Sequence, residues 1–124
     1  QGANKAVFQA RRAAAEIREY LFLHRYAIRD DRVVEEGGRL YQVFCAATPT
    51  ENREGILLPK GWPADCFLLG YQAFEKRDPL TRILAQRMLN GYEKNLLTAS
   101  TPKLIRQAEQ MRQIIKNWEE PPCS

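Results

Sequence analysis

Two adjacent glycines, Gly37 and Gly38, separate two runs of β-branched and aromatic residues. Glycine adopts positive φ without steric cost, and the tight turns that join antiparallel strands need positive φ. The sequence therefore predicts a β-hairpin with strands over 32–35 and 39–46. The second strand would place Leu40 and Phe44 on one face and Val43 on the other. Because both faces are largely apolar, we expect this strand to be central or covered.

Helical spacing is found on both sides of this hairpin. From Asn4 to about Arg25 the chain is Ala-rich, lacks Gly and Pro, and repeats apolar residues at steps of three and four, which predicts one long amphipathic helix. The Arg29-Asp30-Asp31 segment is interpreted as a turn. Asp78-Pro79 and Thr101-Pro102 each join a capping side chain to a proline, and they predict the starts of two further helices.

The region between the hairpin and these later helices is less regular. Residues 47–54 are polar and predict an exposed loop, and residues 55–58 are a short strand candidate. Residues 62–74 could form a fourth strand or a short helix, and we favour the helix because the apolar residues fall at helical steps.

These elements predict an α+β fold with a small antiparallel sheet of two to four strands. One long helix would precede the sheet, and two or three helices would follow it. We assign a single domain to residues 3–120. Residues 1–2 are typical of the remainder of an engineered protease site, and we expect residues 121–124 to form a frayed tail.

Several kinds of chemistry lack their sequence motifs. The chain has no Cys-x-x-Cys, His-x-x-x-His or Glu-x-x-His spacing, so we expect no metal site. It also lacks the glycine-rich phosphate-binding loops, and we expect no cofactor. The single histidine, His24, is interpreted as a partly buried core residue. A nucleophilic pair of His24 with Cys45 or Cys66 is an alternative. Our main prediction is that the chain is not an enzyme.

The cellular setting is predicted from cysteine usage and hydropathy. Three cysteines at wide, unmatched spacings favour a reduced, cytoplasmic protein. No apolar run approaches the roughly 20 residues that a membrane-spanning helix needs, so we expect no membrane partner.

Charge is distributed unevenly around a net value of +4. Both ends of the chain are basic and residues 33–75 are acidic, which is compatible with an anionic partner. On the last helix, basic and amide side chains oppose the apolar stripe from Leu104 to Trp118, and arginines of the first helix could extend that face. The predicted nucleic-acid-binding residues, for DNA or RNA, are Arg11, Arg12, Arg18, Arg25, Lys103, Arg106, Gln110 and Gln113.

We therefore predict a non-enzymatic binding or regulatory module that associates with nucleic acid. The alternative is a protein-protein adaptor, which could be a homodimer. It would use Trp62, in a Gly- and Pro-bounded loop, or Trp118, at the end of a stripe with heptad-like spacing. Packing of Trp62 over the sheet edge and a solvated basic face are the structural alternatives to these two interaction surfaces.

Overall fold

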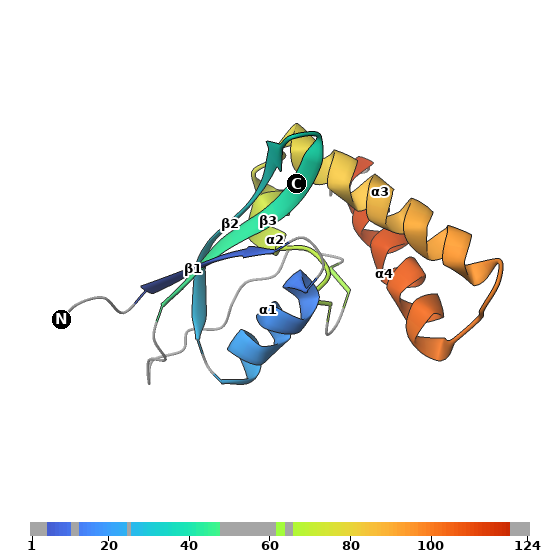
Figure 1. Cartoon of the computed structure of the whole chain (residues 1–124), viewed down its shortest axis with the longest axis horizontal. Coiled ribbons are helices and arrows are strands. Elements are labelled where there is room, and N and C mark those ends of the chain that lie inside the picture. The colour runs from blue at the N-terminus through green and yellow to red at the C-terminus, as the bar shows by residue number, and fades with distance from the viewer. Residues whose placement is uncertain (1–4, 11–12, 25, 48–61, 64–65, 120–124) are drawn as a thin grey trace.

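The computed structural model describes residues 5–10, 13–24, 26–47, 62–63 and 66–119. Within these residues it has three strands and four helices (Figure 1). In chain order they are β1 (Lys5–Ala10), α1 (Ala14–Leu23), β2 (Ala27–Glu36), β3 (Arg39–Ala47), α2 (Tyr71–Glu75), α3 (Pro79–Leu96) and α4 (Pro102–Glu119).

The strands form one antiparallel sheet in the order β1-β3-β2. The predicted hairpin is confirmed, since Gly37 and Gly38 adopt φ values of 59° and 79° between β2 and β3. The central position of β3 is also confirmed. Alternate side chains of β3, including Leu40 and Phe44, are buried, and those between them are half-buried. The fold class is therefore α+β.

The first helix is shorter than predicted because its first part is a strand. Residues 5–10 pair with β3, and Phe8 lies opposite Phe44 with ring centroids 5.6 Å apart. Cross-strand pairing and the burial of Ala10 outweigh the helix propensity of the alanines. The turn predicted at Arg29-Asp30-Asp31 is also wrong, because strand pairing with β3 continues through this segment. These residues lie within β2, where Asp31 is buried.

The two long helices begin where the sequence predicted. The Asp78 carboxylate accepts a hydrogen bond from the backbone N–H of Leu80, and Pro79 opens α3. The hydroxyl of Thr101 accepts from the backbone N–H of Leu104 in the first turn of α4. The helix favoured over 62–74 is confirmed only at its end, in α2. The loop expected over 47–54 begins one residue later than predicted, because Ala47 ends β3; the rest of it and the strand expected over 55–58 lie outside the described residues.

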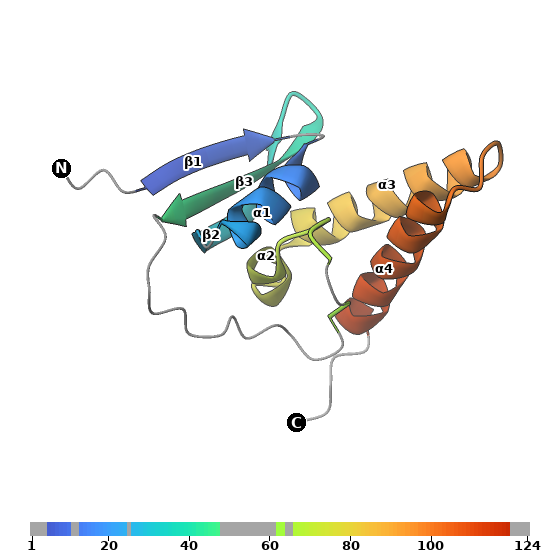
Figure 2. The ribbon, with the colours of Figure 1, turned by 90° about the horizontal axis from the view of Figure 1, so that it is seen from below.

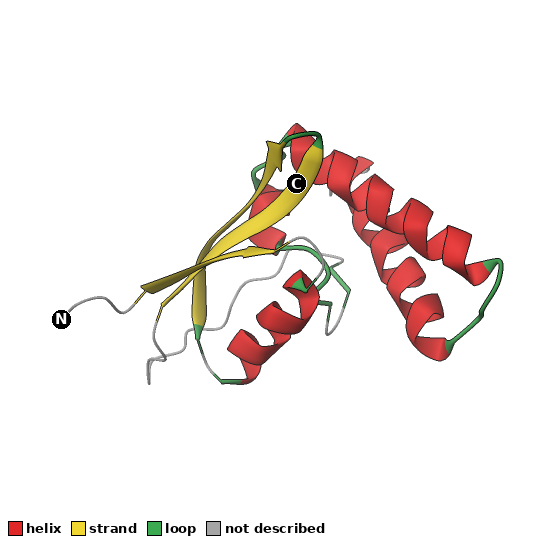
Figure 3. Cartoon of the chain, viewed as in Figure 1, coloured by secondary structure: helices red, strands yellow, loops and turns green. Residues whose placement is uncertain are grey.

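Two clusters of buried side chains divide the core. One lies between the sheet and α1, and includes Leu21, Phe44 and Ala46. The other lies among the later helices, and includes Leu69, Met111 and Ile114. Figures 1 and 3 show α3 and α4 as a hairpin that extends away from the strands, and Figure 2 shows the same separation from another direction. None of the described helices is both long and apolar enough to cross a membrane.

Candidate nucleic-acid interface

The α3–α4 hairpin is anchored at its base by an aromatic cluster. Phe74 of α2 packs edge to face against Trp62 and Trp118, with ring centroids 5.3 and 5.4 Å apart. Arg77 adopts φ 56°, which residues other than glycine rarely do, and its guanidinium lies 5.0 Å from the centre of the Trp118 ring. Arg77 also donates a hydrogen bond to the carbonyl oxygen of Trp118. Both tryptophans therefore serve the packing of this chain.

The surface of the hairpin is strongly basic. Residues 79–119 contain seven Lys and Arg residues and three Glu residues. Two cations are paired, since Arg82 lies 3.1 Å from Glu119 and Arg112 lies 3.2 Å from Glu93. The other five are exposed, and none forms an ion pair within the described part of the chain. They are Arg87, Lys94, Lys103, Arg106 and Lys116.

The structure places the predicted residues of α4 on the hairpin. Lys103, Arg106 and Gln113 are exposed, whereas Gln110 is half-buried. The opposite stripe packs inward, because Ala108, Met111 and Ile115 are buried. Sequence reasoning missed Arg87, Lys94 and Lys116. The signal that could have found them is the excess of positive charge over residues 79–119, taken together with the helical hairpin.

The arginines predicted on the first helix do not extend this surface in the described residues. Arg11, Arg12 and Arg25 lie outside them. Arg18 is described, and it is only 3% exposed. Its assignment to nucleic-acid binding is therefore corrected, because a buried guanidinium cannot reach a phosphate.

Arg18 instead forms a buried ion pair with Asp31. Its Nε and Nη2 atoms donate to the two carboxylate oxygens of Asp31 at 2.9 and 2.7 Å. Its Nη1 atom donates to the carbonyl oxygen of Phe67 at 3.2 Å, and the guanidinium lies 4.7 Å from the centre of the Phe44 ring. Arg18 thus ties α1 to β2 and to the segment that leads into α2.

The environment of Asp31 is tight as well as charged. A Cβ atom added at Gly70 would lie 2.1 Å from the carboxyl carbon of Asp31, so this position requires glycine. Burial raises the pKa of Asp31, because a carboxylate loses its hydration, and the nearby positive charge of Arg18 opposes that rise. The pair is a structural cross-link.

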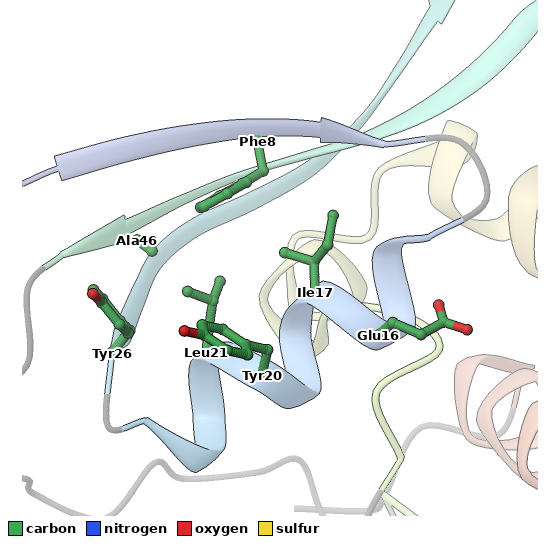
Figure 4. Close-up of a pocket in the computed structure, with 7 residues that line it drawn as sticks. All are labelled: Phe8, Glu16, Ile17, Tyr20, Leu21, Tyr26 and Ala46. Carbon is green, nitrogen blue, oxygen red and sulfur yellow. The ribbon is translucent and has the colours of Figure 1, made fainter.

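A cleft of about 380 Å³ lies between β1 and α1. Figure 4 shows Phe8 of the sheet facing Ile17 and Leu21 of α1, with Glu16 at one end. The complete lining is Phe8, Glu16, Ile17, Tyr20, Leu21, Tyr26 and Ala46. This lining is almost entirely apolar, so the cleft suits apolar side chains better than a charged ligand.

The structure offers little support for a nucleophilic or metal site. Burial raises the pKa of the Cys66 thiol, which disfavours the reactive thiolate. His24 is exposed, contrary to the expectation of a core residue, and it stacks on Tyr20 with ring centroids 3.9 Å apart. Among the described residues, no group of three or more His, Cys, Asp or Glu side chains could hold a metal ion.

No protein-family model and no curated protein matches the sequence. Solved structures do match the fold. The chain is similar to the M1A22 tRNA methyltransferase TrmK of B. subtilis, with a TM-score of 0.60 and 23% identity over 97% of this chain and 52% of that chain. The chain shares the fold of about half of that solved structure.

Two further structures support this comparison. M. capricolum TrmK in complex with S-adenosyl-homocysteine has a TM-score of 0.63 and 14% identity over 94% of this chain and 49% of that chain. A Streptococcus pneumoniae protein in complex with S-adenosyl-L-methionine has a TM-score of 0.62 and 15% identity over 90% of this chain and 47% of that chain. The chain thus spans about half the length of each matched structure.

These matches correct the prediction of function. The expected non-enzymatic module, its DNA-binding role and the adaptor alternative are overturned, because the matched structures include tRNA methyltransferases, which are enzymes. Sequence reasoning missed this because it searched for complete catalytic motifs. A nucleic-acid partner remains compatible with the matches, with RNA in place of DNA.

The described residues do not fit S-adenosyl-L-methionine. In open α/β sheets such ligands bind beyond the carboxyl ends of parallel strands, commonly at a glycine-rich turn that opens a helix. Here the described sheet is wholly antiparallel, and the 11–13 connection between β1 and α1 is Arg-Arg-Ala. The cleft between β1 and α1 has only one ionisable carboxylate, Glu16, and no cationic side chain in its lining.

Proposed function

We propose that this chain forms part of an S-adenosyl-L-methionine-dependent tRNA methyltransferase and that the α3–α4 hairpin binds the tRNA. The observation that carries the proposal is the match of 97% of this chain to B. subtilis TrmK. Because the described residues do not fit the methyl donor, we assign this half a role in holding the RNA substrate. A tRNA substrate also agrees with the predicted cytoplasmic location.

The electrostatics of the hairpin support its role in RNA binding. Its five exposed cations that form no ion pair with any described residue lie on two antiparallel helices. Lys103 and Arg106 are one turn apart near the start of α4. Each Lys or Arg that neutralises a phosphate releases counterions, which favours binding. The exposed end of β2, next to the turn, carries Glu35 and Glu36, which would repel phosphates. The hairpin is therefore the preferred surface for a polyanion.

Gln110 and Gln113 add amide groups along the same helix. An amide can accept and donate hydrogen bonds to sugar hydroxyls and base edges, which an ammonium group cannot do. We propose that Lys103 and Arg106 position the RNA backbone and that these two glutamines contact it next to the cations.

The test measures the binding of a fluorescently labelled, unmodified tRNA transcript to the whole chain. Binding is measured by fluorescence anisotropy at a series of salt concentrations. The variant Lys103→Ala/Arg106→Ala removes two cations from the hairpin. The control Arg32→Ala/Arg39→Ala removes two exposed cations from the sheet and gives the same net charge. We expect the hairpin variant to bind about tenfold more weakly and to reduce the slope of log K against log salt by about 1.5 to 2.

Two results would refute the proposal. The first is equal weakening by the hairpin variant and the sheet variant, because binding would then depend only on net charge. The second is the finding that a duplex DNA of the same charge binds to the chain as tightly as the tRNA does at near-physiological salt. Either result would remove the RNA-binding role from this half of the fold.

A further inference from the structure

We propose that one face of α3 is a close-contact site for the ribose-phosphate backbone of the RNA. Four exposed residues form this α3 contact face, and they are Arg87, Asn90, Gly91 and Lys94. Gly91 lets the RNA approach the helix, the two cations bind phosphates, and Asn90 recognises a ribose 2′-hydroxyl. The inference rests on the proposed function, and it adds to the contacts of α4 a site that distinguishes RNA from DNA.

Helix geometry places the four residues together. They occupy positions i, i+3, i+4 and i+7 of a continuous helix, and this spacing puts side chains on one face. The opposite side of α3 is buried, at Ala85 and Leu89. At about 1.5 Å of rise per residue, Arg87 and Lys94 are about 10 Å apart along the helix axis. Gly91 lies between them.

Gly91 serves no packing role within the described part of the chain. Apart from proline, glycine is the least favourable residue in a helix interior, and Gly91 lies well inside α3. Its backbone is helical, so no positive φ requires glycine there. A Cβ atom added at this position would meet no atom within 4 Å. A helix glycine that the fold does not need indicates a surface that another molecule approaches closely.

Hydrogen bonds along α3 orient the amide of Asn90. The Arg82 guanidinium donates to the side-chain oxygen of Gln86 at 3.1 Å, and the Gln86 amide nitrogen donates to the side-chain oxygen of Asn90 at 3.0 Å. Arg82 is itself held by Glu119, 3.1 Å away. The Asn90 oxygen is thereby engaged, which leaves its amide nitrogen to donate to another acceptor. A ribose 2′-hydroxyl is such an acceptor, and DNA lacks it.

The charges on the α3 contact face decide which molecule it fits. Arg87 and Lys94 form no ion pair within the described part of the chain. A guanidinium can bind two phosphate oxygens at once, and an ammonium attracts a phosphate as a point charge. A helix glycine can also bring two helices together, but a second copy of α3 would place cations against cations. Like charges repel, so a polyanion is the preferred occupant.

The experiment repeats the tRNA titration with variants of this face. Gly91→Leu fills the space beside the helix with a good helix former, so we expect its urea midpoint to equal or exceed that of the natural chain. We expect the same variant to bind the tRNA at least about tenfold more weakly, because the cations can no longer reach the phosphates. Ala99→Leu adds the same side chain in the exposed α3–α4 turn, and this matched control should bind within about twofold of the natural chain.

A second variant tests the contact with the 2′-hydroxyl. The titration compares the tRNA with a DNA strand of the same sequence. We expect the natural chain to bind the tRNA more tightly than this DNA. Asn90→Ala should reduce that preference by about threefold or more, because it weakens the binding of the RNA alone.

Three results would overturn the inference. They are unchanged tRNA binding by Gly91→Leu, equal weakening by Gly91→Leu and Ala99→Leu, and an unchanged preference for RNA in Asn90→Ala. A dimer of the natural chain that Gly91→Leu disrupts, as measured by light scattering, would also overturn it and assign the face to a second copy.

The two proposals can fail separately. If Lys103→Ala/Arg106→Ala weakens tRNA binding and Gly91→Leu does not, the hairpin keeps its role and this inference is refuted. If Gly91→Leu weakens binding and the α4 variant acts only through net charge, the α3 contact face stands and the role of the α4 cations is refuted. A natural chain that binds no tRNA refutes both.

Discussion

Replacing Asp31 with asparagine removes the charge that pairs with Arg18 and keeps the size of the side chain. The two side chains are only 3% and 4% exposed, so neither charge is solvated by water. In the variant, Arg18 keeps its hydrogen bond to the Phe67 carbonyl oxygen but has no counter-charge. Removing one partner of a buried ion pair costs about 3–5 kcal/mol, and we expect Asp31→Asn to lower the free energy of unfolding by that amount.

The loss is measurable by urea denaturation followed by far-UV circular dichroism at pH 7. A folded domain is stable by about 5–15 kcal/mol, so the variant should unfold at a clearly lower urea concentration. Asp30→Asn is the matched control at the adjacent position. The Asp30 side chain is 33% exposed and its ion pairs are at the surface, so we expect a loss of about 1 kcal/mol or less.

A double variant tests whether the cost comes from the isolated charge. Arg18→Met/Asp31→Leu removes both charges and fills a similar volume, so we expect it to lie within about 2 kcal/mol of the natural chain. A loss below about 1 kcal/mol for Asp31→Asn would refute the reasoning, because the guanidinium would then be solvated in the folded state. The reasoning also fails if the double variant is no more stable than Asp31→Asn.

Three further predictions concern single positions. Gly70→Ala should lower the free energy of unfolding by at least about 3 kcal/mol, because its Cβ would overlap the buried carboxylate of Asp31. Gly91→Ala, with open space around it in α3, should raise the free energy of unfolding by about 0.5–1 kcal/mol. Urea denaturation measures both changes. A hydrogen bond from Lys76 is the main cause that lowers the pKa of Asp30 from 3.8 to about 2. The stability from this group is therefore present above pH 4 and lost as the pH falls through 2, so the difference between the natural chain and Asp30→Asn should shrink steadily from pH 4 to pH 2. Ellman's reagent should label Cys66 at least about tenfold more slowly in the folded chain than in urea, as measured by peptide mass spectrometry, and equal rates would contradict the burial of this thiol.

The elements set by local sequence were predictable. The turn at Gly37 and Gly38 depends on backbone conformation at two adjacent residues, and the start of α3 depends on Asp78 and Pro79. Each signal lies within a few residues of the structure that it determines. The apolar stripe of α4 was predictable for the same reason, because helical spacing places its residues on one face.

Elements set by distant contacts were not predictable from local patterns. Over residues 5–10 the alanines favour a helix, yet the strand conformation depends on pairing with β3, more than thirty residues away. Asp31 looked like a turn residue because its partner, Arg18, is thirteen residues earlier in the sequence. The same ion pair removed Arg18 from the predicted nucleic-acid face. A charge in the sequence does not reveal whether the fold buries it.

The candidate interface was partly predictable from the sequence. Lys103 and Arg106 were identified from the polar face of one amphipathic helix. The contribution of α3, through Arg87 and Lys94, depends on the hairpin that brings the two helices together. The likeness to solved tRNA methyltransferases could be found only from the fold of the chain, because methyl-donor motifs are absent from the described residues.

The aromatic cluster at the base of the hairpin has a mechanical consequence. Trp118 and Arg77 hold the end of α4 against α2, and the turn between α3 and α4 lies at the far end of both helices (Figure 1). A helix of 18 residues is about 27 Å long, so a rotation of about 10° at the base would move the far end by about 5 Å. The hairpin therefore has the geometry of a lever arm. Small changes in the packing of Phe74 would become large changes in the positions of the cations that we propose to contact RNA.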